Sequence, residues 1–258
     1  MREIETPRRS LRSASWATLL RSASSVLVKS FHLGERPVET RLFVRHADGD
    51  WAGYSNRWRE DGSDAELLTE GATAEIAGQT WNFPSRGECL FCHTAAAGRS
   101  LGLETAQLDL DIVVDGAAKN QLEHLVDLGV LAVRPAGAGA PYPPTSGEGA
   151  LEARARAYLH ANCSHCHRPD APGGRSSIDL LYTTPLAEAK SCDVLPRSGE
   201  LGIDDARLIA PGEPTRSLIP ARMRSTSAAR MPEVGSLAVD DGGVALIEAW
   251  IAELDVCP

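Results

Sequence analysis

Two five-residue segments of this chain place cysteine and histidine at the same spacing. Residues 89–93 read CLFCH, and residues 163–167 read CSHCH. Two thiols separated by two residues can each add to one of the neighbouring vinyl groups of a haem, and a histidine directly after them lies beneath the iron, where its imidazole is a good axial ligand. The sequence therefore predicts two covalently attached haem c groups. The predicted attachment points are Cys89, Cys92, Cys163 and Cys166, and the predicted iron ligands are His93 and His167.

The second predicted haem needs a ligand on the face opposite His167. Met231 precedes Pro232 in the loop before the last expected helix. A proline biases the residue before it toward an extended conformation, which suits a loop that presents a thioether to iron. Met231 is the predicted distal ligand, and Met223 is its rival. Ligation by histidine and methionine would raise the reduction potential relative to two histidines.

The first predicted haem has no comparable partner, because no Met-Pro pair follows His93 within its own module. His124, Met223, His46 and a water molecule are the candidate distal ligands. An iron with a single protein ligand can bind small molecules, whereas an iron with two usually only transfers electrons. An open first haem is the basis for one alternative, a peroxidase-type dihaem enzyme, although the sequence contains no acid–base pair that decides for it.

Zinc binding is the other chemistry that the four thiols of the two motifs permit, because four cysteines can form a structural zinc site. Nothing in zinc binding requires a histidine directly after both pairs, so the sequence favours haem. A structural module stabilised by zinc or by disulfides remains the second alternative.

The elements expected around these residues define the fold class. Segments rich in β-formers predict strands at 26–31, 40–45 and 51–58, and residues 74–81, with Gly78 inside them, are expected to close a small sheet. Ser85 can cap a short helix that carries the first motif, and a further helix is expected over 120–128. A helix over 146–162 leads into the second motif, and an amphipathic helix over 240–254 closes the chain. We expect a mainly α fold of cytochrome c-like modules with a small β-rich N-terminal region, α+β overall.

Composition divides the chain into five expected segments. They are a poorly ordered N-terminus at 1–21, a small β-rich region at 22–83, a first haem-motif module at 84–134, a Pro- and Gly-rich linker at 135–149 and a cytochrome c-like domain at 150–258.

Charge and hydropathy exclude some classes of partner. The formal net charge of −9 argues against nucleic acid or an anionic membrane surface as the main partner. The sequence contains no run of 18 apolar residues, so no membrane span is expected. Aromatic residues make up only 5% of the chain, which fits a fold in which a porphyrin supplies flat apolar bulk.

The two cysteines outside the motifs, Cys192 and Cys257, either pair or remain free thiols. Paired, they close a loop of about 65 residues, worth roughly 4 kcal/mol in the chain-entropy model. A disulfide and haem c attachment both belong to an oxidising compartment, so we expect a periplasmic or otherwise extracytoplasmic location. No signal peptide is recognisable: residues 7–12 are only faintly similar to a twin-arginine start, and Arg21 interrupts the Ser-rich segment after them.

Beyond the motifs, the chain resembles a family of bacterial dihaem cytochrome c-like exported proteins over roughly residues 22 to 257. The matching blocks are residues 26–31, 39–42, 51–54, 83–93, 101–105, 120–122, 154–163, 211–214 and 230–232. Members of that family carry more sequence before the first strands and a signal peptide, and residues 1–21 match neither. Some relatives are joined to β-propellers similar to sugar dehydrogenases.

The resemblance implies haem attachment and iron ligation at the motif residues, with Met231 as a ligand. It also implies a protein that accepts electrons from a periplasmic dehydrogenase, or delivers them to a terminal acceptor. The expected function is therefore periplasmic electron transfer, without substrate chemistry of its own.

Overall fold

The structure, a computed structural model, describes residues 25–135, 140–173, 176–235 and 237–258. The expectation for residues 1–21 falls outside this description. The fold is mixed α+β, with 24% helix and 22% strand. It divides into two compact units. The smaller unit contains Gly102–Tyr142, and the larger combines Ala23–Leu101 with Pro143–Pro258.

The larger unit begins with a four-stranded antiparallel sheet in the order β1-β2-β3-β4. Its strands are β1 (Val26–Leu33), β2 (Arg36–Arg45), β3 (Trp51–Trp58) and β4 (Ala65–Leu67). Gly34 turns the chain between the first two strands with a φ of 61°, which glycine adopts without steric cost. Val38 and Phe43 of β2 are buried. The strands expected at 26–31, 40–45 and 51–58 are confirmed.

The segment at 74–81, expected to close a small sheet, belongs to a separate two-stranded hairpin of β5 (Ala72–Ile76) and β6 (Gln79–Phe83). Ala77 and Gly78 turn the chain with φ values of 51° and 76°. Two consecutive positive φ angles match the right-handed twist of the flanking strands. Gly78, noted within this segment from the sequence, is the second residue of the turn. Ile76 and Phe83 pack with Val38 in a small core.

Four helical segments organise the chain after Pro143. They are α5 (Leu151–Cys163), a 3-10 turn η1 (Pro214–Arg216), α6 (Leu218–Arg224) and α7 (Asp241–Glu253). The helix expected from residue 146 begins only at Leu151, because Gly147 and Gly149 have φ angles of 98° and 125° that no right-handed helix contains. The closing helix is confirmed, and the Asp240 side chain caps it by accepting from the Gly243 N–H at 2.9 Å.

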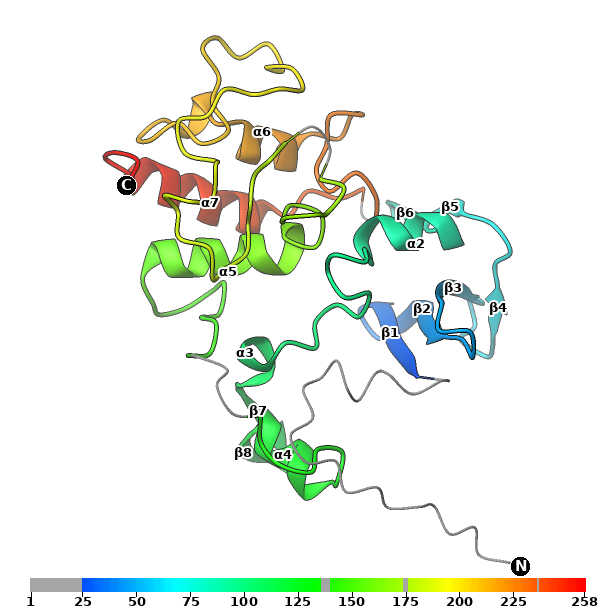
Figure 1. The fold of residues 1–258 in the computed structure, drawn as a ribbon. Helices are drawn as coiled ribbons and strands as arrows, with labels where there is room; N and C mark the ends of the chain where they lie inside the picture. The colour runs from blue at the N-terminus through cyan, green and yellow to red at the C-terminus, as the bar shows by residue number, and fades with distance from the viewer. Residues whose placement is uncertain (1–24, 136–139, 174–175, 236) are drawn as a thin grey trace, which may run out of the picture. The chain divides into compact units, whose positions relative to one another are not determined.

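The main core of this unit lies between α5 and α7, which run side by side (Figure 1). Leu159 of α5 and Ile247, Trp250 and Ile251 of α7 are almost completely buried there. The apolar face that the sequence predicts for the closing helix is therefore the face that packs on α5.

The smaller unit contains α3 (Thr105–Leu108), a hairpin of β7 (Asp111–Val114) and β8 (Ala117–Asn120), and α4 (Gln121–Asp127). The Asn120 side chain caps α4 by accepting from Leu122 N–H at 3.0 Å and Glu123 N–H at 3.3 Å. The helix expected at 120–128 is confirmed, whereas the short hairpin before it was not predicted.

No helix in the described part of the chain has the length and apolar character needed to cross a membrane.

Candidate functional site

The first motif is carried by α2 (Arg86–Cys92), a helix that the sequence starts with a complete capping box. The Ser85 hydroxyl accepts from the Glu88 N–H at 3.3 Å, and the Glu88 carboxylate accepts from the Ser85 N–H at 2.8 Å. This satisfies two backbone donors that a helix start otherwise leaves unpaired. The expected cap at Ser85 is confirmed, and it fixes where Cys89 and Cys92 lie.

Strand β3 passes directly beneath Cys89. A Cβ atom added to Gly53 would lie 2.4 Å from the Cys89 Sγ, so only glycine permits this approach. Burial raises the pKa of the Cys89 thiol. The sheet thus supports one side of the first motif, a role that the sequence did not reveal for Gly53.

His93 follows α2 directly, and its side chain is oriented by two neighbours. Its Nδ1 lies 2.6 Å from the Arg99 carbonyl oxygen, and its ring stacks on Phe43 with 4.0 Å between centroids. Because a carbonyl oxygen only accepts, Nδ1 must carry the proton, which leaves Nε2 with a lone pair for a metal. Burial lowers the pKa of His93 and so favours the neutral ring that binds a metal.

The second motif begins at the last residue of α5. Backbone bonds from Cys166 N and His167 N to the Cys163 carbonyl, at 3.1 and 2.9 Å, continue the chain in a tight turn. Burial raises the pKa of the Cys163 thiol to about 12 and lowers the pKa of His167. The thiol and the imidazole are therefore both neutral in the folded chain.

The surroundings of His167 are close-packed on one side. A Cβ atom on Gly173 would lie 2.7 Å from His167 Nδ1 and 2.5 Å from the Cys166 carbonyl oxygen. His167 Nδ1 is buried without a hydrogen-bond partner among the described residues. No feature of the sequence indicated that Gly173 approaches the motif.

His160, on the helix that enters the motif, has a structural role. Its Nδ1 accepts from the Tyr182 N–H at 3.1 Å, and its carbonyl oxygen accepts from the Ser164 hydroxyl at 2.7 Å. These bonds tie the end of α5 to the loop after the motif.

The two motifs contact each other within the larger unit. The Thr94 hydroxyl donates to the His165 carbonyl oxygen at 2.9 Å, and the Cys166 Sγ lies 3.0 Å from the Phe91 carbonyl oxygen. A hydrogen bond from the Cys166 thiol lowers the pKa of Cys92, and the same pairing raises the pKa of Cys166. Sequence spacing alone contains no sign of this contact.

Met231 lies in the loop between α6 and α7 and is half-buried. Its N–H donates to the Arg222 carbonyl oxygen at 3.0 Å. The charge of Glu233, two residues later, contributes to raising the pKa of Cys166, so this loop lies near the second motif. The role of Met231 as a distal ligand stays a prediction.

The rival distal candidates have other surroundings. Met223 packs against the core between α5 and α7. The His46 Nε2 is 3.0 Å from the Tyr54 hydroxyl. His124 belongs to the smaller unit, where its Nδ1 is buried without a partner in the described part of the chain. Each of these ligand assignments stays a prediction.

The four motif thiols are free in the structure. Across the residues that the structure describes, no three His, Cys, Asp or Glu side chains are grouped so as to hold a metal ion. The zinc-bound and disulfide-bonded alternatives for these four cysteines stay predictions.

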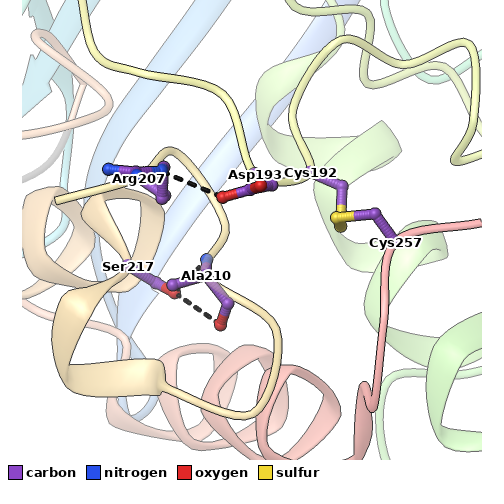
Figure 2. The surroundings of a disulfide bond; sticks show 6 residues. All are labelled: Cys192, Asp193, Arg207, Ala210, Ser217 and Cys257. Carbon is purple, nitrogen blue, oxygen red and sulfur yellow. Dashed lines mark hydrogen bonds and ion pairs between the residues drawn. A yellow bond between two sulfur atoms is a disulfide. The ribbon is translucent and has the colours of Figure 1, made fainter. Parts of the chain in front are cut away.

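Cys192 and Cys257 form a disulfide, the pairing that the sequence offered as one of two possibilities (Figure 2). Cys192 packs against the main core, and the bond attaches to it the chain end that follows α7. Beside it, Arg207 Nε donates to Asp193 at 2.9 Å (Figure 2). The Ser217 hydroxyl accepts from the Ala210 N–H at 2.8 Å and donates to the Ala210 carbonyl oxygen at 3.5 Å, the contact that Figure 2 draws.

Comparison of the chain with models of protein families, with curated proteins and with solved structures finds no match. The function therefore has to be argued from the site itself.

Proposed function

We propose that this protein is a dihaem c-type cytochrome that transfers electrons in an extracytoplasmic compartment. Its modules are of the cytochrome c type, and it belongs with the bacterial dihaem family that its sequence resembles. Its partner is a periplasmic dehydrogenase or a terminal acceptor. A bound haem supplies one-electron oxidation and reduction at its iron.

The observation that carries the proposal is the state of His93. An axial histidine needs Nδ1 tied to an acceptor so that Nε2 is unprotonated and correctly directed. The 2.6 Å contact between His93 Nδ1 and the Arg99 carbonyl meets that need, and the stacked Phe43 ring holds the imidazole plane. A histidine with only a structural role beside two thiols has no requirement for this arrangement.

The state of the motif thiols also fits covalent attachment of haem. Cysteines in an oxidising compartment normally pair, as Cys192 and Cys257 do. The four cysteines of the motifs are free, as thiols that receive a haem must be. In this proposal Cys89 and Cys92 hold one haem, Cys163 and Cys166 hold the other, and His93 and His167 are the proximal ligands.

The proposal is tested by expressing the whole chain with the haem-maturation machinery and measuring covalent haem per chain. We expect two haems, seen as haem stain on a denaturing gel and as the matching mass increase. The variants C89A/C92A and C163A/C166A should each retain one haem. The matched control C192A/C257A removes as many cysteines but should keep both.

A chain without covalent haem, or one that binds zinc through its motif thiols, contradicts the proposal. The peroxidase-type alternative has its own signature, because it requires a high-spin first haem that reacts with peroxide. Two low-spin haems without turnover support electron transfer.

A further inference from the structure

Arg230 is a buried cation with unsatisfied donors. Only 8% of the residue is exposed, and its Nε and Nη1 are buried without a hydrogen-bond partner among the described residues. Guanidinium stays protonated in proteins, so the group cannot escape burial by losing its charge. A charge taken out of water is tolerated when a partner of opposite charge accepts its hydrogen bonds.

Other arginines of the chain show what a satisfied guanidinium looks like here. Arg41 donates through Nε and Nη2 to both oxygens of Glu39, at 2.7 and 2.8 Å. Arg36, Arg154 and Arg216 each have one unpaired buried Nε, but each has a partner for another nitrogen. In the described part of the chain, Arg230 alone has two buried nitrogens without partners.

The loop that carries Arg230 is held in place by its backbone. Arg230 N donates to the Ser227 carbonyl at 3.1 Å, and Arg222 Nη1 donates to the Ala229 carbonyl at 3.0 Å. The next residue, Met231, is the predicted distal ligand of the second motif. Glu233 lies close enough to Cys166 for its charge to act on that thiol. The unpaired cation is therefore fixed in a loop that lies near the second motif.

We infer that Arg230 binds a carboxylate of the group held at the second motif, which is a haem propionate. The inference rests on the proposed function. A carboxylate oxygen accepts a charge-assisted hydrogen bond from a guanidinium N–H. Nε and Nη1 are the two nitrogens that lack partners, and their N–H groups leave the guanidinium on different sides, so the missing ligand is an anionic group that offers more than one acceptor oxygen.

The inference predicts a change in one reduction potential. Removing the cation leaves the propionate charge uncompensated, which favours oxidised iron over reduced iron. In haem-loaded R230M we expect the oxidised-to-reduced equilibrium of the second haem to shift about tenfold, which is about 59 mV toward lower potential for one electron. The first haem should not change. R230K keeps the charge but not the guanidinium donors, so its shift should be smaller.

Redox titration of the full haem-loaded chain, followed by absorption, measures both potentials. R224M is the control, since Arg224 is an exposed arginine whose ion pair is with Glu248 on α7, and it should shift neither potential. C89A/C92A identifies which of the two waves belongs to the second haem. If R230M does not fold, the reduction potentials of R230K and R230Q test the role of Arg230 instead.

The outcomes separate the two proposals. The role of Arg230 is overturned if haem is attached at Cys163 and Cys166 but both potentials are unchanged in every Arg230 variant. The proposed function stands in that case. An equal shift in R224M overturns it as well. Absence of covalent haem overturns the proposed function, and the role of Arg230 with it.

Discussion

Glu39 shows how a single buried carboxylate supports the first motif. The residue has no exposed surface, and it accepts from Arg41 Nε, Arg41 Nη2 and Trp81 Nε1 at 2.7, 2.8 and 3.0 Å. Arg41 in turn lies over the Phe31 ring. These contacts join β1, β2 and β6, and the charges of Glu39 and Arg41 both act on the pKa of the Cys89 thiol.

We predict that E39A destabilises the folded chain by about 3–5 kcal/mol, because it leaves the partly buried Arg41 without its counter-ion. E39Q should cost less, since an amide oxygen still accepts one hydrogen bond. Urea denaturation measures both changes. E66A is the matched control, an exposed glutamate in β4 of the same sheet, and should stay within about 0.5 kcal/mol of the parent chain. An E39A variant as stable as E66A would contradict this account.

The sequence identified the individual residues whose chemistry depends on their spacing in the chain. Cys89, Cys92 and His93 are found from a five-residue pattern. Arg99 and Gly53 were missed, since one acts through a backbone carbonyl, which any residue supplies, and the other by lacking a side chain. Neither property leaves a mark in a single sequence.

Among the elements, α5 and α7 meet at one very close point. A Cβ atom on Gly243 of α7 would lie 2.2 Å from the Tyr158 ring of α5. The Tyr158 hydroxyl donates to Asp240 Oδ2 at 2.9 Å, while the other oxygen of Asp240 caps α7. Tyr158 thus fills the contact between α5 and α7 and also hydrogen-bonds Asp240, the residue that caps α7.

We predict that G243A destabilises the larger unit by about 1–3 kcal/mol, because the added methyl group forces the two helices apart. The neighbouring substitution G242A is the control. Its Cβ would meet only Asp240 Oδ1, at 3.5 Å, so it should be neutral or slightly stabilising, as alanine is in a helix. Thermal unfolding of both variants gives the comparison, and equal melting temperatures would show that the helix contact does not need glycine.

Element prediction succeeded where periodicity and caps agree, as in the closing helix with Asp240. It failed where backbone conformation overrides the pattern. The positive φ angles of Gly147 and Gly149 delay α5 to Leu151, and those of Ala77 and Gly78 make a separate hairpin of the segment that was expected to close a small sheet. Apolar side chains lie at even-numbered positions up to Ile76 and at odd-numbered positions from Trp81, so the alternation changes phase across the turn.

In the whole molecule, contacts between segments that are distant in sequence bring the two motifs together. The Thr94–His165 bond joins residues 71 apart in sequence and brings both motifs into one compact unit. Its two groups, a hydroxyl and a backbone carbonyl, are common to most sequences. The sequence therefore predicted two motifs in two successive modules but gave no basis for their contact.

The Cys192–Cys257 disulfide is the other long-range connection, with a sequence separation of 65. We predict that C192A/C257A lowers the free energy of unfolding by about 4 kcal/mol, the loop-closure entropy that the bond removes from the unfolded chain. Denaturation in urea measures the loss. Adding a thiol reductant should destabilise the parent chain by a similar amount and leave the variant unchanged.

The same variant separates the disulfide from the chemistry of the motifs. Cys192 and Cys163 both pack against the core between α5 and α7, but the disulfide partner of Cys192 is Cys257, whereas Cys92 and Cys166 lie where the two motifs meet. C192A/C257A should therefore keep both haems at temperatures where it remains folded, and lose them only with global unfolding. Loss of the second haem from a folded variant would show that the disulfide also shapes the site, through the closing helix that it attaches to the core.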